Sequence, residues 1–319
     1  MLDMSAVESY RPLLMTLAYR MLGSLSEAED IVQDALADYA MTVDRGSITH
    51  EKAYLVRMVT NRSLKLKQSA RKRREFYVGQ WLPEPAIADG GIGGAAAALG
   101  SATGKNGNPA HYIERQENIT YVMLVMLERL TAVERAVFLL RETLDFDYGE
   151  ISDIVQKSEA NCRKIFSRAK EKLQGLAGEG GGAEAIDPMR RNEEQAWAIA
   201  KAFLQAAETG NSSALVDMLA HDAVLVTDGG DKARAAINPI EGSERIAAFF
   251  IGNARKGTMG DSFLPVDVSG QPGFIVIQDG QPAMVMVFGW DAEKRISRIF
   301  IILNPDKLEG VTNRFAAWS

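Results

Sequence analysis

Apolar residues recur every three or four positions through much of the first 176 residues, a spacing that is typical of helices. Across residues 55–72, the apolar positions fall within about 60° of one another on a helix. Residues 131–174 contain three further segments of this kind, "TAVERAVFLLRE", "DYGEISDIV" and "SEANCRKIFSRAKEKL". The first half of the chain is therefore predicted to be all-α.

The pattern of apolar positions changes beyond residue 190. Residues 196–207 keep a helical spacing, but four strand-like runs follow them, "AVLVTD", "GFIVIQ", "AMVMVFGW" and "ISRIFIIL". Asp279-Gly280 lies between two of these runs and signals a hairpin. One or two helices followed by a meander of strands predict an α+β domain with a curved antiparallel sheet.

Two stretches rich in glycine and small residues interrupt these patterns, "DGGIGGAAAALGSATGKNGNP" (89–109) and "GEGGGAEAIDP" (178–188). Such composition is typical of flexible linkers. The predicted organisation is a helical domain, a linker, a second helical domain, a hinge and an α+β domain, at residues 1–80, 81–110, 111–176, 177–189 and 190–319.

The second helical domain has the pattern of a helix-turn-helix. Capping-box spacing, or close to it, occurs at Ser26 with Glu29, Thr131 with Glu134, and Asp147 with Glu150. Gln156-Lys157 supplies the short turn, and Ser158 is a candidate N-cap for the last helix. An ordinary three-helix bundle would show a similar pattern. Cys162 belongs to the apolar stripe of the last helix and is interpreted as a core residue.

Composition narrows the possible classes of protein. The 319 residues suffice for two or three domains, and no apolar run approaches the roughly 20 residues that a membrane-spanning helix requires. A single cysteine rules out an intramolecular disulfide, and three scattered histidines leave little material for a metal site. We therefore expect a soluble cytoplasmic protein with no metal, no cofactor and no catalytic residues.

The net charge of −6 hides a sharp separation of sign. Residues 26–51 carry seven acidic side chains and one basic one, whereas residues 57–74 carry eight basic side chains and no acidic one. On the helix over residues 55–72, cations and two amides gather on a face opposite the apolar stripe. Such a face favours binding to a polyanion, with cations for phosphates and amides for base edges. The alternative is an exposed helix whose lysines only confer solubility.

Two segments of the helical part of the chain resemble a known family. "YRPLLMTLAYRMLGSLSEAEDIVQDALADYA" resembles region 2, and residues 130–173 resemble region 4, of the extracytoplasmic-function sigma factors of the sigma-70 family. The resemblance is closest to a subgroup with a C-terminal SnoaL-like extension. Its three signatures stand here as "WLPEP" (81–85), "DGGDK" (228–232, usually with a third glycine) and "NPDKL" (304–308). The resemblance implies two all-α domains followed by an α+β cone of the nuclear-transport-factor-two-like type.

The resemblance also implies partners, namely promoter DNA and core RNA polymerase through its β′ clamp helices and β flap. The residues matching the β′-binding surface are Glu29, Asp30, Gln33 and Asp34. Those matching the reader of the −10 element are Arg57, Asn61, Arg62, Lys65, Gln68, Arg71 and Lys72. Those matching the reader of the −35 element are Ser158, Asn161, Arg163, Lys164, Ser167 and Arg168.

The three signature motifs are expected to form an interdomain regulatory contact. Trp81 is a suitable anchor because it buries a large area with few torsions, and the two prolines hold its segment extended. We expect this segment to dock near the "DGGDK" turn or the "NPDKL" segment. The residues concerned are Trp81, Leu82, Pro83, Glu84, Pro85, Asp228, Gly229, Gly230, Asp231, Lys232, Asn304, Pro305, Asp306, Lys307 and Leu308. Packing of Trp81 on its own domain is the alternative.

Three other functions remain open from the sequence. The chain could be an autonomous helix-turn-helix regulator, although the acidic helix would then have no use. The third domain could also be a SnoaL-type enzyme, or a sensor of an unidentified small molecule. Asp228, Asp231 and Lys232 could supply a base and a cation, but a glycine-rich turn favours a surface loop over a pocket floor. His221 is expected in a solvent-facing turn just before the first strand.

Overall fold

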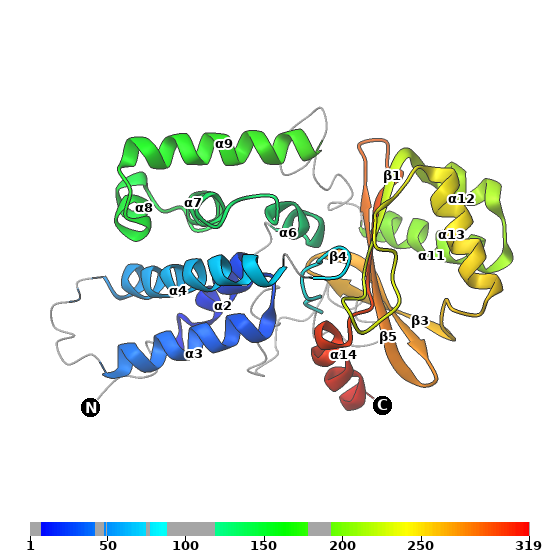
Figure 1. The fold of residues 1–319 in the computed structure, drawn as a ribbon, viewed down its shortest axis with the longest axis horizontal. Helices are drawn as coiled ribbons and strands as arrows, with labels where there is room; N and C mark the ends of the chain where they lie inside the picture. Colours follow the sequence, from blue (N-terminus) through cyan, green and yellow to red (C-terminus); the bar gives the residue numbers. More distant parts are fainter. Residues whose placement is uncertain are drawn as a thin grey trace. The chain divides into compact units, whose positions relative to one another are not determined.

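The computed structural model describes residues 8–41, 48, 50–74, 77–87, 119–177 and 193–318, and it divides into two compact units (Figure 1). Of these residues, unit 1 holds 8–74 and 126–177, and unit 2 holds 77–87, 119–125 and 193–318. The 89–109 insert and the 178–188 hinge lie outside the described residues. Within those residues, no helix is both long and apolar enough to cross a membrane.

Unit 1 begins with three helices, α2 (Arg11–Leu22), α3 (Leu25–Met41) and α4 (Glu51–Arg74). The three helices pack against one another, and Leu17, Val32 and Leu55, one from each helix, are at most 2% exposed. The Ser24 hydroxyl accepts the Glu27 amide at 3.3 Å, so α3 is capped at Ser24. The predicted cap at Ser26 is wrong, because the left-handed Gly23 ends α2 and only Gly23 and Ser24 lie between the two helices, so that Ser26 already belongs to α3.

Three more helices of unit 1 form the expected helix-turn-helix region, α7 (Ala132–Glu142), α8 (Tyr148–Val155) and α9 (Glu159–Ala177). The capping boxes at the starts of α7 and α8 are confirmed, with both reciprocal bonds present in each. Gln156 takes a left-handed conformation in the turn before α9, and the Ser158 hydroxyl accepts the Asn161 amide at 3.4 Å. Cys162 is fully buried, and this burial raises the pKa of its thiol, which confirms its place in the core.

A cluster of buried charge joins the two sets of helices within unit 1. The Arg135 side chain of α7 is fully buried, and its Nε donates to the main-chain oxygen of Arg20 in α2 at 2.5 Å. Its guanidinium pairs with Glu128, which also pairs with Lys67 Nζ of α4 at 3.1 Å. Glu128 thus holds one cation from each set of helices.

Unit 2 is an α+β domain built on a six-stranded sheet. Its strands are β1 (Leu219–Asp228), β2 (Ile240–Glu241), β3 (Ser262–Val268), β4 (Gln271–Gln278), β5 (Gln281–Trp290) and β6 (Ile296–Ile302). Their order is β2-β1-β6-β5-β4-β3. The Asp279-Gly280 hairpin is confirmed, since both residues have positive φ and close the β4–β5 pair. The sheet is mixed, however, because β1 and β6 pair in parallel. Local pattern could not reveal that pairing, because a helix and the β3–β5 meander separate the two strands along the chain.

Helices cover both sides of this sheet. Figure 1 shows α11 (Glu193–Thr209), α12 (Ser212–Met218) and α13 (Ser243–Arg255) on one side and α14 (Pro305–Trp318) on the other. The side with three helices encloses a chain of aromatic rings in mutual contact, among them Phe203, Phe250, Phe274, Phe288 and Trp290. This is the α+β domain of the cone type that the resemblance implied, and the rings form part of its buried core.

The opposite face of the sheet is apolar as well. Ile275, Val285 and Val287 alternate with the ring-bearing positions of β4 and β5 and are fully buried. Leu308 and Val311 of α14 are buried with them. Two segments between α4 and α7 also belong to this unit, namely residues 77–87 and residues 119–125, which include the start of α6 (Tyr121–Leu127). Both are called linker segments, although they extend beyond the predicted linker bounds of 81–110.

Candidate functional site: a buried carboxylate that binds the linker

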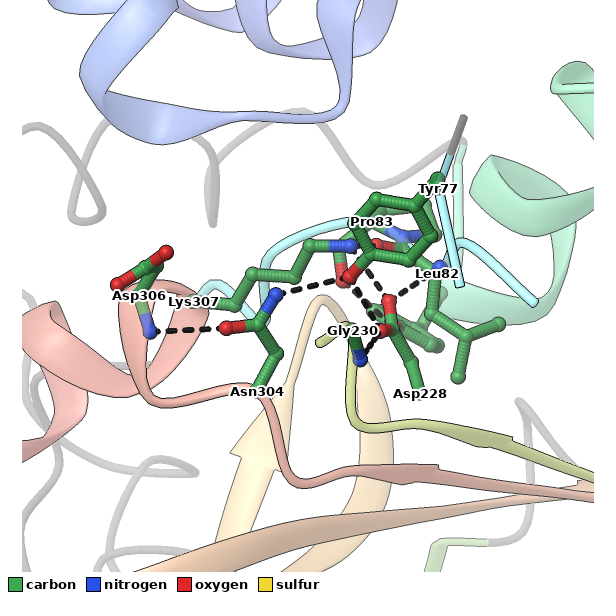
Figure 2. Close-up of polar contacts among 9 residues, drawn as sticks. Tyr77, Leu82, Pro83, Asp228, Gly230, Asn304, Asp306 and Lys307 are labelled. Carbon is green, nitrogen blue, oxygen red and sulfur yellow. Dashed lines mark hydrogen bonds and ion pairs between the residues drawn. The ribbon is translucent and has the colours of Figure 1, made fainter. Parts of the chain in front are cut away.

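Asp228 is the last residue of β1, and its side chain is fully buried. Figure 2 shows four donors converging on its carboxylate. Oδ1 accepts the Tyr77 hydroxyl at 2.5 Å and the Gly230 amide at 3.2 Å. Oδ2 accepts the Leu82 amide at 2.7 Å and Lys307 Nζ at 2.5 Å. A buried carboxylate is tolerated only with such compensation, and two of its four donors come from the linker.

Lys307, in the first turn of α14, connects the carboxylate to the linker a second time. Its Nζ also donates to the Leu82 main-chain oxygen at 2.5 Å. The same nitrogen lies 4.1 Å from the centre of the Trp81 ring and 5.1 Å from that of Tyr77. Two aromatic rings around a largely desolvated ammonium group give favourable cation–π contacts. Lys307 is therefore held by the linker's backbone and by its side chains.

Asn304 positions both α14 and Tyr77. Its Oδ1 accepts the Asp306 amide at 3.1 Å, which satisfies a free donor at the start of the helix. Its Nδ2 donates to the Tyr77 hydroxyl at 2.8 Å. Burial raises the pKa of the Tyr77 phenol well above its usual value, and the hydrogen bond to Asp228 raises it further. Tyr77 thus remains a neutral donor to the carboxylate.

The glycines of the "DGGDK" turn are required by close approach. A Cβ on Gly229 would lie 2.2 Å from the Ala233 oxygen. Gly230 has φ +57°, and a Cβ there would lie 2.8 Å from Asn304 Nδ2 and 3.0 Å from the Tyr77 hydroxyl. The backbone of Asp231 lies outside the left-handed region, so a side chain in place of the subgroup's third glycine causes no strain.

The rest of the "WLPEP" segment extends along the unit to the edge of the sheet. Leu82 is 1% exposed. Ile87 forms an antiparallel bridge with Val268 at the end of β3, and the Ala86 oxygen accepts the Ser269 amide at 3.0 Å. Arg314 of α14 donates to the Ile87 oxygen. The linker therefore binds by main-chain pairing at a sheet edge as well as through its side chains.

A second linker segment is anchored on the same unit. The Tyr121 hydroxyl donates to the Pro83 oxygen at 2.7 Å, and the Val122 amide donates to Gln271 Oε1 at 2.8 Å. A Cβ on Gly289 would lie 2.6 Å from Val122 Cγ2, so this glycine makes room for the segment. Because Tyr121 contacts Pro83 directly, the two ends of the linker are joined to each other.

Comparisons with known proteins agree with this architecture. Residues 6–74 match the family described as "Sigma-70 region 2", and residues 122–173 match "Sigma-70, region 4". The chain is 27% identical to the ECF RNA polymerase sigma factor SigJ of Mycobacterium tuberculosis, over 97% of this chain and 94% of that protein. It belongs to the extracytoplasmic-function sigma factors. As such it acts in transcription initiation.

Two further similarities extend over nearly the whole sigma factor. It is 25% identical to a protein described as probable ECF RNA polymerase sigma factor SigI of M. tuberculosis, over 96% of this chain and 94% of that one. A crystal structure of M. tuberculosis SigJ superimposes with a TM-score of 0.71 at 25% identity, covering 96% of this chain and 98% of that one. The similarity therefore includes the C-terminal domain.

The structure brings together part of the residue set expected in the regulatory contact. Trp81, Leu82, Asp228, Asn304 and Lys307 meet around the carboxylate. The expectation that Asp228 lies on a surface loop is wrong, because linker residues cover the end of β1.

Other members of the expected regulatory set lie away from the carboxylate. Asp231 and Lys232 are exposed, and Lys232 pairs with Asp306 at 2.6 Å. Glu84 and Leu308 are buried, whereas Pro305 is exposed. His221 is exposed, as expected, but it lies within β1 instead of in a turn before it.

In region 2 of the sigma factor, the expected polymerase- and DNA-binding residues lie on separate helices. The acidic set on α3 is exposed, with Glu29, Asp30, Gln33 and Asp34 all on the solvent side. On α4, Arg57, Lys65 and Gln68 are exposed, while Asn61 and Arg62 are half-buried. Arg62 pairs with Asp38 of α3. The side chains of Arg71 and Lys72 lie outside the described part of the chain.

In region 4, the expected −35 readers share the exposed face of α9. Ser158, Asn161, Arg163, Lys164, Ser167 and Arg168 are all exposed. The opposite face is closed by Cys162, Ala169 and Leu173. The last helix therefore has the arrangement needed for a helix that enters a groove.

The sequence did not reveal the linker residues Tyr77 and Tyr121, nor Gln271 and Arg314 of the C-terminal domain, all of which make the docking contacts. Tyr77 lies only four residues before Trp81, but nothing in the surrounding sequence indicates which distant residue its hydroxyl will bind. Gln271 is fully buried in a strand, and a polar residue in an otherwise apolar run was the one available signal.

Proposed function

We propose that the C-terminal domain, residues 190–319, inhibits this sigma factor in cis by holding the linker between regions 2 and 4. The observation that carries the proposal is that both linker ends bind the same domain and contact each other through Tyr121 and Pro83. In this arrangement the domain takes the place of a separate anti-sigma protein.

Docking shortens the connection between regions 2 and 4. Between Phe76 and Met126 the free linker spans about 50 residues and could reach about 170 Å when extended. With Pro83 joined to Tyr121, only about 12 residues still contribute, which reach about 40 Å. The centres of the −10 and −35 elements are about 25 base pairs apart, or about 85 Å along B-form DNA. The docked connection is much shorter than this span.

Contacts inside unit 1 support the same conclusion. Regions 2 and 4 pack against each other, and Glu128 bridges Lys67 of region 2 and Arg135 of region 4. Helix α4 has 24 residues and is therefore about 36 Å long. Two regions in direct contact are too close to read elements about 85 Å apart, so promoter binding requires them to separate.

Because the linker and the C-terminal domain are parts of one chain, a contact of modest affinity is enough to keep the linker bound. A linker site on the same chain works at an effective concentration in the millimolar range. Because four donors, two of them from the linker, already occupy the carboxylate of Asp228, it is poorly placed to act as an enzyme's base, which favours regulation over catalysis.

The proposed division of labour among the helices follows their charges. The acidic face of α3 binds the β′ clamp helices, and region 4 binds the β flap. The basic face of α4 opens and reads the −10 element, and the exposed face of α9 reads the −35 element. Separate surfaces are needed because an acidic patch facing DNA would repel its phosphates. The proposal also includes the division of the chain into domains, with boundaries after residues 80, 110, 176 and 189.

The test compares two aspartates of the same turn in the full-length chain. Asp228→Asn removes the charge that holds Lys307, whereas Asp231→Asn changes an exposed residue outside that contact. We expect Asp228→Asn to speed hydrogen exchange of the Leu82 amide at least tenfold and to raise the number of transcripts started by the sigma factor in its own bacterium. Asp231→Asn should change neither quantity. Faster exchange without new transcripts would contradict inhibition by linker docking.

The role of Trp81 gives a second test of the docking. Trp81→Ala removes the ring that covers Lys307, and Trp81→Phe keeps an aromatic face. Alanine should release the linker and change transcription, and phenylalanine should preserve most of the contact. If alanine changes neither crosslinking of the linker to α14 nor transcription, the ring plays no part in regulation.

A further inference from the structure

Tyr148, the first residue of α8, is held by the core of region 4. Its ring packs edge-on against Phe166 of α9, with centroids 6.3 Å apart. Phe166 in turn stacks on Phe138 of α7 at 6.0 Å. The Tyr148 ring therefore packs on Phe166 of α9, which is itself held in place by Phe138 of α7. It is half-buried, so one part of it remains at the surface.

Two arginines lie against this ring. The guanidinium carbon of Arg163 is 4.6 Å from the ring centre, and that of Arg141 is 5.2 Å away. Arg141 is tied to the protein through a 2.9 Å bond to the Phe146 main-chain oxygen. Arg163 instead donates to Glu159 Oε2 at 2.8 Å, and its side chain is 57% exposed. Of the two, Arg163 is the one that extends from the expected reading face of α9.

We propose that Tyr148 is a positioning residue that presents Arg163, together with Glu159, to one base pair of the −35 element. This inference rests on the proposed function of α9 as the −35 reader. A free arginine samples many rotamers, but stacking on a fixed ring and pairing with Glu159 restrict it before DNA arrives. A guanidinium group held in one orientation favours a bidentate contact to guanine O6 and N7. This contact distinguishes guanine from the other bases only when its geometry is correct.

Glu159 and Arg163 have complementary chemistry at the part of the helix that enters the groove. They lie one turn apart in the N-terminal half of α9, which is the part of a recognition helix that contacts base edges. A carboxylate accepts from the cytosine amino group, and it repels the backbone phosphates that a lone arginine would also bind. The pair is therefore suited to a G·C base pair more than to the DNA backbone.

The experiment selects −35 sequences from a random promoter library with full-length sigma factor and core RNA polymerase of its own bacterium. Each variant is made in two versions of the chain, one otherwise unchanged and one that also carries Asp228→Asn, the substitution expected to release the linker. Tyr148→Leu removes the ring, Tyr148→Phe keeps it, and Arg163→Lys keeps the charge without the planar fork. Lys170→Ala is the matched control, because Lys170 lies over Phe166, on the same helix but not on Tyr148.

We expect Tyr148→Leu to reduce the preference at one position about fivefold to tenfold, at the same position that Arg163→Lys affects. Tyr148→Phe and Lys170→Ala should leave the selected motif unchanged. Glu159→Gln is a second variant that leaves the ring intact, and it should weaken the same position. An unchanged motif with Tyr148→Leu, or an equal loss at all positions, would overturn the positioning role. If Arg163→Lys changes the preference at no position, or if no motif is selected in either background, the proposed role of α9 as the −35 reader is contradicted, and the inference about Tyr148 falls with it.

Discussion

Lys307 and Asp228 form a buried ion pair, with Nζ and Oδ2 2.5 Å apart, and the Leu82 backbone binds both members. The Leu82 amide donates to the carboxylate while the Leu82 oxygen accepts from the ammonium group. One linker residue thus completes the coordination of both charges. When the linker leaves, the pair loses three hydrogen bonds, two to the Leu82 backbone and one to the Tyr77 hydroxyl, and gains exposure to water, which couples linker binding to the stability of the domain.

Lys307→Met is expected to destabilise the C-terminal domain by roughly 3–5 kcal/mol, because it leaves the Asp228 carboxylate buried without its counter-charge. Methionine keeps the length of the side chain, so the loss reports charge more than packing. The measurement is thermal unfolding of the full chain together with protease sensitivity of residues 77–87.

Lys232→Met is the matched control for that change, since Lys232 pairs with Asp306 at the surface. It should leave both the unfolding temperature and the protease sensitivity unchanged. Equal effects of the two substitutions would mean that the buried pair of Asp228 and Lys307 contributes no more to stability than the exposed pair of Lys232 and Asp306.

Gly230→Ala is expected to weaken linker docking, because the added Cβ would lie 2.8 Å from Asn304 Nδ2 at a φ of +57°. We expect a loss of about 1–3 kcal/mol, measured by hydrogen exchange of the Leu82 amide. Asp231→Gly, which restores the third glycine of the subgroup, should cost at most about 1 kcal/mol, through the unfolded chain alone. A larger effect at residue 231 than at residue 230 would contradict this account of the turn.

Glu128→Gln is expected to open unit 1. It removes the carboxylate that pairs with the fully buried Arg135 and with Lys67, and leaving a buried charge uncompensated costs roughly 3–5 kcal/mol. Energy transfer between dyes on α4 and α9 should fall, which reports separation of regions 2 and 4. Glu171→Gln, an exposed change on α9, should leave the transfer unchanged. Unaltered transfer with Glu128→Gln would show that other contacts hold the regions together.

The pH dependence of docking should show the effect of Tyr77. Burial, aided by the hydrogen bond to Asp228, raises the pKa of its phenol in the folded state above the unfolded value. The contribution of Tyr77 to stability is therefore complete below the unfolded pKa of about 10 and is lost as the pH rises beyond it. Protection of the linker from protease should decline above about pH 10, and Tyr77→Phe should remove this part of the decline. A decline of the same size in Tyr77→Phe would assign it to another group.

Much of the local structure could be predicted from the sequence. The capping boxes of α7 and α8 join residues three positions apart, and the Asp279-Gly280 turn joins adjacent strands. The buried stripe of α9 follows from the helical period alone. The charge separation between α3 and α4 was also visible, because it depends only on which residues occur in each segment. In each case the interacting residues are close along the chain, so the pattern contains both partners.

Only the tertiary structure decided the partners of distant residues. Leu82 and Asp228 are separated by 146 positions, and no local pattern indicates that a strand-end aspartate will be covered by a linker. The parallel pairing of β1 with β6 and the contact of Tyr121 with Pro83 have the same origin. The sequence by itself determined which segments become helices and strands and where their charges lie. Chain collapse determined which buried polar groups meet, because each had to find compensating donors somewhere in the folded molecule.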